Sequence, residues 1–97
     1  MHTIVDIGTL IVRTPGTCGG RPRIAGLRLS VQGIAALYKE GLTPEEIVEE
    51  FDYLSLAQVY AALTYYHANQ AEIEAYLAAD KAEYDRLEAE HQAGQTV

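Results

Sequence analysis

A Ser or Thr flanked by apolar residues recurs three times along the middle of the chain. In each copy a Leu precedes the hydroxyl residue, and an Ile or Val stands four positions after it. The hydroxyl oxygen can accept a hydrogen bond from a free N–H of a first helical turn, and the apolar pair forms a hydrophobic staple. The copies begin twelve or thirteen residues apart, so each has room for one short helix. They are Leu29-Ser30 with Ile34, Leu42-Thr43 with Ile47, and Leu54-Ser55 with Val59.

The pattern predicts helices over residues 31–40, 44–51 and 56–66. Glu46 and Gln58 stand three residues after their caps and complete two capping boxes, while Gly41 suits the end of the first helix. Helical spacing predicts the buried faces. These are Ile34, Leu37 and Tyr38; Ile47, Val48 and Phe51; and Leu56, Val59, Tyr60 and Leu63. The outward face of the third helix is predicted to carry Ala57, Gln58, Ala61, Ala62 and Tyr65.

The first thirty residues have the pattern of short strands. Residues 3–7 alternate, residues 9–12 are apolar or β-branched, and Gly8 separates the two runs. Residues 15–20 are rich in Pro and Gly and predict a turn, after which residues 23–25 and 27–29 suit a second strand or an extended arm. So small a β-ribbon is marginal alone, so we expect it to lie on the helices or to pair with another copy of the chain.

A fourth helix is predicted over residues 69–92, which contain no Pro or Gly and are rich in Ala, Glu and Leu. A largely polar helix is poorly stabilised unless its apolar stripe finds a partner. The stripe could pack on the chain's own core, on a second copy, or in a groove of another protein. Together with the outward Tyr65, it supplies the predicted partner contacts: Ile73, Tyr76, Leu77, Tyr84 and Leu87.

Together these elements predict one domain over residues 1–97, of mainly α class. A small N-terminal β-ribbon and basic arm (1–29) precede a three-helix unit (30–68) and an acidic C-terminal helix (69–93). The three-helix unit has the outline of a helix-turn-helix, but the spacing suits a plain three-helix bundle equally well.

Charge is divided unequally along the chain. Residues 1–39 hold five basic residues and one acid, a balance of +4, whereas residues 40–97 hold two basic residues and thirteen acids, a balance of −11. These recover the total of −7. Such asymmetry indicates two surfaces with different partners, although the acidic half alone is typical of a solvated helical surface.

The sequence contains no group of residues that predicts catalysis. It has no phosphate-binding loop, no paired metal motif and no nucleophile beside a base, so no enzyme, cofactor or metal site is expected. No apolar run is long enough to span a bilayer, and the start of the chain lacks the pattern of a signal peptide. The single cysteine, Cys18, cannot form an internal disulfide, so the expected location is the cytoplasm.

DNA binding is one candidate function. A helix-turn-helix places the start of its second helix in the major groove, where Gln58 could contact adenine through two hydrogen bonds and Ser55 could contact a phosphate. The third helix carries no Lys or Arg, so affinity would depend on the arm before the helices. A homodimer would double that basic surface and match a two-fold operator. The arm residues are Arg13, Arg21, Arg23 and Arg28.

The segment from Gly19-Gly20-Arg21-Pro22-Arg23 through Gly26-Leu27-Arg28 resembles the domain of unknown function 433 family. The resemblance extends over roughly residues 9–77 and includes the starts of the next two helices. Leu27 replaces that family's usual Thr and Ser30 its frequent Pro. The resemblance implies a homeodomain-like helix-turn-helix and a DNA-binding antitoxin of a bacterial type II toxin–antitoxin pair. Such a protein would repress its own operon and neutralise a PIN-like ribonuclease.

The rival hypothesis is a protein-interaction module that keeps the helix-turn-helix fold without binding DNA. The absence of basic residues from the third helix favours it. In the antitoxin hypothesis, the basic arm faces operator DNA and the acidic fourth helix faces the toxin.

Overall fold

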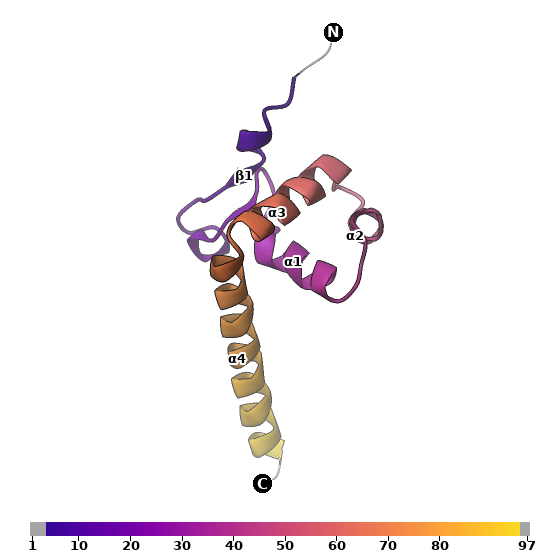
Figure 1. Cartoon of the computed structure of the whole chain (residues 1–97). Coiled ribbons are helices and arrows are strands. Elements are labelled where there is room, and N and C mark those ends of the chain that lie inside the picture. Colours follow the sequence, from indigo (N-terminus) through magenta and orange to yellow (C-terminus); the bar gives the residue numbers. More distant parts are fainter. Residues whose placement is uncertain (1–3, 96–97) are drawn as a thin grey trace.

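The computed structural model describes residues 4–95 and is mainly helical, as predicted. In Figure 1 the first three helices and the strands form one body, and the last helix extends away from it, opposite the N-terminal end. The chain therefore measures 65 × 28 × 22 Å. The elements are η1 (Ile7–Thr9), β1 (Ile11–Val12), η2 (Cys18–Gly20), β2 (Arg23–Ile24), α1 (Val31–Lys39), α2 (Pro44–Glu50), α3 (Leu56–Ala68) and α4 (Gln70–Gln95), where η marks a short 3-10 helix.

Each of the three predicted caps starts a helix. The Ser30 hydroxyl accepts a hydrogen bond from the N–H of Gly33, and Thr43 and Ser55 accept in the same way from the residues three positions on. Both capping boxes are closed, because the side chains of Glu46 and Gln58 accept the cap residues' own N–H groups at 2.9 Å. The predicted bounds of these three helices are confirmed to within two residues.

The N-terminal strands are shorter than predicted. β1 pairs antiparallel with β2, with Ile11 opposite Ile24, and both strands lie against α3. The prediction of a strand over residues 3–7 is wrong for residues 4–7, while Thr3 lies outside the described residues. The reason is local: Asp6 caps η1 by accepting the N–H of Gly8 at 2.9 Å, so the chain turns where an alternating strand would have continued.

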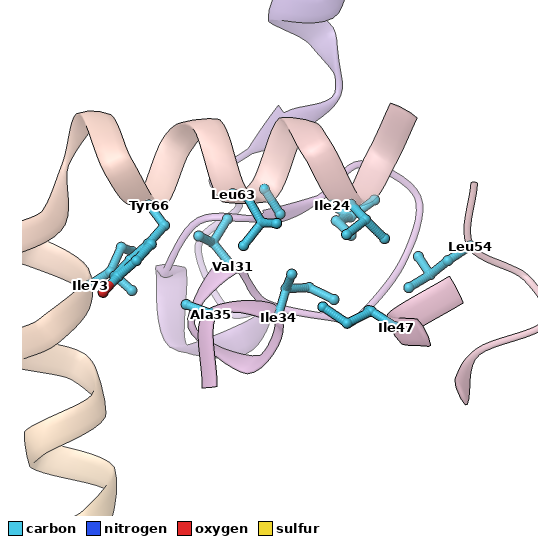
Figure 2. Packing of buried hydrophobic residues seen from close by; sticks show 11 residues of the cluster. Ile24, Val31, Ile34, Ala35, Ile47, Leu54, Leu63, Tyr66 and Ile73 are labelled. Atoms are coloured by element: carbon cyan, nitrogen blue, oxygen red, sulfur yellow. The ribbon is translucent and has the colours of Figure 1, made fainter. Parts of the chain in front are cut away.

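The core lies between α1, α2, α3 and β2. Aliphatic side chains from all four elements are completely buried and face one another in Figure 2. Tyr66 of α3 and Ile73 of α4 close the core at the corner between their helices. The buried cluster contains Ile24, Val31, Ile34, Ala35, Ile47, Leu54, Val59, Ala62, Leu63, Tyr66 and Ile73.

The buried face of α3 differs from the prediction. Leu56 and Tyr60 were expected inside but are 42% and 50% exposed, whereas Ala61 and Ala62 were expected outside and are buried. The observed stripe keeps the helical spacing, but it lies on the side of Ala61 and Ala62 and not on the side of Leu56 and Tyr60. The small alanines let α3 pack closely against its neighbours. The stripe runs through Val59, Ala62, Leu63 and Tyr66.

Tyr38 at the end of α1 also lies less deep than predicted. It is 38% exposed, and its ring packs edge-on against Tyr66 and His67 at centroid distances of 6.4 and 5.6 Å. Tyr38 therefore lies at the margin of the core, with its ring partly covered by Tyr66 and His67.

α4 divides into two parts. Its first two turns pack on the chain's own core through buried Ile73 and half-buried Tyr76 and Leu77, which is one of the three expected arrangements. From residue 78 to residue 94 every side chain is exposed. This difference between the two parts follows from the direction of α4. The helix leaves the end of α3 at an angle that carries its later turns beyond the body (Figure 1).

Candidate functional site

Three acidic residues of α4 each bind a basic residue from the N-terminal half of the chain. This set of contacts, here called the α4 clamp, joins segments 35 to 59 positions apart in the sequence. Its ion pairs are Arg13–Glu72, Arg21–Asp80 and Lys39–Glu74.

Glu72 is the most heavily bonded member of the clamp. Besides the Arg13 guanidinium, it accepts hydrogen bonds from the hydroxyls of Tyr65 at 2.8 Å and Tyr76 at 2.7 Å. Arg13 also donates to the Tyr65 hydroxyl. Partial burial by itself would raise the pKa of Glu72, but the three donors outweigh it and hold the pKa below its ordinary value. The bond to Glu72 raises the pKa of Arg13.

The other two pairs are also supported by tyrosines. Arg21 donates to Asp80 at 2.8 Å and stacks over the Tyr76 ring, 4.5 Å from its centroid, which is a cation–π distance. Lys39 donates to Glu74 at 2.6 Å, and Tyr66 donates to the second carboxylate oxygen. The Lys39 ammonium, followed by the Tyr66 hydroxyl, lowers the pKa of Glu74.

Arg23 supports the β-ribbon. Its guanidinium donates to the carbonyl of Leu27 at 2.8 Å and to the Thr14 hydroxyl at 2.9 Å, and so ties together the two turns on either side of the short sheet. The Arg23 side chain therefore stabilises the fold of the β-ribbon.

Arg28 is the exception among the four predicted DNA-binding arginines. It is exposed, and its guanidinium has no hydrogen bond or ion pair within residues 4–95. It lines an open groove of about 320 Å³ together with Leu27, Leu29 and Tyr53. This groove lies beside the turn between α2 and α3, so its cation and exposed phenol are available to a ligand.

The predicted base-contacting residues at the start of α3 are partly engaged already. The Gln58 side-chain oxygen accepts the N–H of Ser55, and the Ser55 hydroxyl accepts the N–H of Gln58. Contact with adenine through two hydrogen bonds requires that oxygen together with the amide nitrogen. While the capping box is closed, Gln58 can offer only the nitrogen.

The predicted partner contacts fall into two groups. Ile73 is completely buried, and Tyr65, Tyr76 and Leu77 are half-buried in the body, so the prediction that Ile73 contacts a partner is corrected by its place in the core. Tyr84 and Leu87 lie on the exposed half of α4 and are 66% and 51% exposed. They stand three positions apart and therefore share one helix face. That face is the only part of the predicted stripe that residues 4–94 leave uncovered.

The exposed half of α4 is stabilised within itself. Lys81 pairs with Asp85 at 2.8 Å, and Arg86 pairs with both Glu83 and Glu90 at 2.6 and 2.7 Å. Pairs at these spacings stabilise a helix through contacts within the helix itself. The result is an ordered acidic helix that presents an aromatic and an aliphatic side chain to solvent.

The described residues contain no group of three or more His, Cys, Asp or Glu side chains arranged to hold a metal ion. Within the same part of the chain, no helix is long and apolar enough to cross a membrane.

The α4 clamp was missed by the sequence analysis. Its signal was the charge asymmetry, which was interpreted as two surfaces with two external partners. In the structure, Arg13, Arg21 and Lys39 instead bind the acidic half of the same chain. No local pattern indicates which acid meets which base, since the pairing depends on the angle at which α4 leaves α3.

The comparisons with known proteins concern the body of the molecule. The family model described as protein of unknown function (DUF433) matches residues 11–66, from β1 to the last turn of α3, and ends before α4. A crystal structure of a DUF433 member protein from Anabaena variabilis is similar, with a TM-score of 0.68 and 31% identity over 72% of this chain and 69% of that chain. No curated protein matches the sequence.

Proposed function

The chain belongs to the DUF433 family, and from that premise we propose that it is a protein-interaction module with a helix-turn-helix fold that binds a partner protein through the exposed half of α4. In this proposal α2 and α3 form the helix-turn-helix. The partner is of the kind that the family resemblance implies, a PIN-like ribonuclease. The module thus has the toxin-binding task of an antitoxin without the DNA-binding task.

The observation that carries the proposal is the α4 clamp. DNA binding depends on cations that can neutralise phosphates. Arg13, Arg21 and Lys39 are already neutralised by carboxylates of α4, and Arg23 is tied to the β-ribbon. A phosphate backbone would have to replace those contacts before it gained any of these charges.

The surroundings of α3 also disfavour DNA. All four acids of α2 are exposed, and Glu45 accepts a hydrogen bond from Tyr60 on the outward face of α3. The outward face of a helix-turn-helix second helix would lie within a few ångströms of phosphates. Carboxylates beside it repel the same surface that the arginines would have to attract.

The exposed half of α4 has the properties of a binding helix. It presents Tyr84 and Leu87 on one face, and its intrahelical ion pairs hold it in helical form before a partner arrives. The two apolar side chains on that face fit an apolar pocket, and the surrounding acids favour a pocket with a basic rim. The matched family segment ends before α4, so this helix lies outside the part of the chain that the family model covers.

A second candidate, the DNA-binding antitoxin, is favoured by one observation. Arg28 and Tyr53 share a groove at the turn that precedes the cap of α3, and the Arg28 guanidinium is uncommitted within the described residues. In that candidate Arg28 contacts a phosphate, and the Ser55 hydroxyl donates to a second one.

The first test is binding to the protein encoded by the adjacent reading frame, with both chains co-expressed and the affinity measured by calorimetry. Replacing Tyr84 and Leu87 together by Ala is expected to weaken binding roughly tenfold to a hundredfold, because exposed aromatic anchors carry much of an interface's energy. The matched control replaces Tyr53 and Leu56, which are 61% and 42% exposed on the body, and is expected to bind normally. Absence of binding by the wild-type chain, or an equal loss in the control, contradicts the proposal.

The second test separates the two candidates. Fluorescence anisotropy with a labelled duplex from the region upstream of the gene is expected to show no salt-dependent binding by the wild-type chain. Binding that weakens linearly with log salt and is lost in Arg28→Ala would contradict the proposal and support the second candidate.

A further inference from the structure

The N-terminal segment, residues 4–7, exposes an unusual amount of aliphatic surface. Ile4, Val5 and Ile7 are 93%, 59% and 72% exposed, although side chains of this kind are among those most often buried. The sequence alternates here as a strand does, but the structure gives the segment no strand partner within residues 4–95.

The direction of this segment is set by the turn that follows it. Asp6 accepts the N–H of Gly8 with its side chain, and its carbonyl accepts both the N–H and the hydroxyl of Thr9. Three hydrogen bonds within four residues fix the angle at which the segment leaves η1. In Figure 1 it leads away from α3 and α4, so it does not fold back over the body.

An apolar groove lies at the base of this segment. The groove has a volume of about 340 Å³ and runs between η1 and the solvent side of α3. Its walls are small or apolar, and its polar groups are neutral. The groove, here called the η1–α3 groove, is lined by Ile7, Gly8, Ile11, Ala61, Thr64, Tyr65, Ala68 and Asn69.

Charge favours a second copy of this chain at this end of the molecule. The chain carries a net charge of −7, and residues 40–97 hold thirteen of its fourteen acids, so most contacts between two copies are repulsive. The segment contains one acid, Asp6, and the groove lining contains none. α4 extends from the opposite end of the molecule, so two copies that meet through their N-terminal ends keep their acidic helices apart (Figure 1).

We propose that two copies of this chain associate by exchanging their N-terminal segments. Ile4 and Val5 of each copy occupy the η1–α3 groove of the other across a two-fold axis, while Ile7 stays in the wall of its own groove. Because Ile7 lies on the rim of its own groove, the segment needs to cross only a short gap, within the roughly 10 Å that three extended residues span. The interface is isologous, so every contact is made twice.

The size of the interface predicts a reversible association. Two aliphatic side chains of this size remove on the order of 200 Å² from water, and a two-fold exchange buries a similar area of groove on the same copy. That is about half of the roughly 800 Å² per partner of a standard interface. A concentration-dependent dimer in the micromolar range is therefore expected, and the association is separate from the proposed binding through α4.

Sedimentation equilibrium of the full chain over a range of concentrations tests the proposal. The wild-type chain is expected to shift from monomer to dimer, and Ile4→Asp together with Val5→Asp is expected to abolish the shift. Thr64→Glu places a charge in the groove without changing the segment and is expected to do the same. Ala57→Glu, at an exposed position of α3 outside the groove, is the matched control and is expected to dimerise normally.

A cross-linking experiment tests the exchange itself. In a Cys18→Ser background, one preparation carries Ile4→Cys and a second carries Ala68→Cys, a groove position. The mixture is expected to form a disulfide-linked species of twice the monomer mass well above the level in either preparation alone. A monomeric wild-type chain at high micromolar concentration overturns the proposal. So does a dimer that survives both Thr64→Glu and the double Asp variant, or a mixture that cross-links no better than its components.

Discussion

At the scale of single residues, the most informative side chain is Glu72. One carboxylate receives an ion pair from Arg13 and hydrogen bonds from two tyrosines, and so joins the residue after β1 to α3 and α4 at one point. Its carboxylate holds the guanidinium of Arg13, one of the four arginines predicted to contact DNA. Because these contacts need the ionised carboxylate of Glu72, the packing of α4 on the body is expected to weaken in acid.

The first prediction concerns pH. The pKa of Glu72 in the folded chain lies below its value in the unfolded chain, about 4.3. Its contribution to stability is therefore complete above that pH and is lost as the pH falls through the lower, folded-state value. Urea unfolding is expected to show a smaller drop in stability between pH 7 and pH 3.5 for Glu72→Gln than for the wild-type chain.

Glu88→Gln is the control for this experiment, because Glu88 is an exposed acid of the same helix beyond the docked turns. It is expected to keep the wild-type pH dependence. An equal effect of the two variants would mean that the Glu72 contacts do not stabilise the docking of α4.

At the scale of elements, the helices begin where a short side chain can accept the first free N–H groups. Thr43 and Ser55 do so within closed capping boxes, which involve residues no more than three positions apart. Local hydrogen bonding of this kind does not depend on the rest of the fold. It explains why the helix starts were predicted correctly.

The second prediction tests the cap of α3. Ser55→Ala removes the acceptor for the N–H of Gln58 and is expected to cost about 1 kcal/mol of unfolding free energy. Ser55→Asp supplies another acceptor and is expected to retain most of the stability. Chemical denaturation checks both variants, and an alanine variant as stable as the aspartate variant would contradict this role for Ser55.

The two halves of α4 are stabilised by different interactions. The first half is held by burial of Ile73 and by the clamp, whereas the second half is held by pairs within the helix itself. The first half therefore belongs to the core, and the second half is available for binding without a cost to the fold.

At the scale of the whole molecule, this division predicts where stability resides. A chain that ends after Asp80 loses no buried side chain, so its Tm is expected to lie within a few degrees of that of the full chain. Ile73→Ala empties a completely buried position and is expected to cost about 2–5 kcal/mol. Thermal unfolding followed by circular dichroism compares the two. A truncated chain less stable than the Ile73→Ala variant would show that the exposed turns are part of the fold.

The sequence predicted the order and type of most elements, but it predicted the faces of α3 only in part. Periodicity restricts the buried face to positions three and four apart, and more than one such stripe passes through α3. The stripe with the larger side chains includes Leu56 and Tyr60, whereas the stripe that packs against the body has Ala61 and Ala62 on its buried side. Small residues are favoured where α3 approaches the strands closely. The sequence of one helix does not specify how close its neighbours come.

By itself the sequence determined where the first three helices start, because caps and staples act on backbone groups within a few residues, whereas α4 continues through Gly94 to Gln95, beyond its predicted end at residue 92. It also determined that positive and negative charge lie in separate parts of the chain. Only the tertiary structure decided that these charges meet each other, since the pairing of Arg13 with Glu72 joins residues 59 positions apart through the angle between α3 and α4. The same angle decided that Ile73 is core while Tyr84 and Leu87 remain in solvent, because a straight helix can follow a small body for only a few turns.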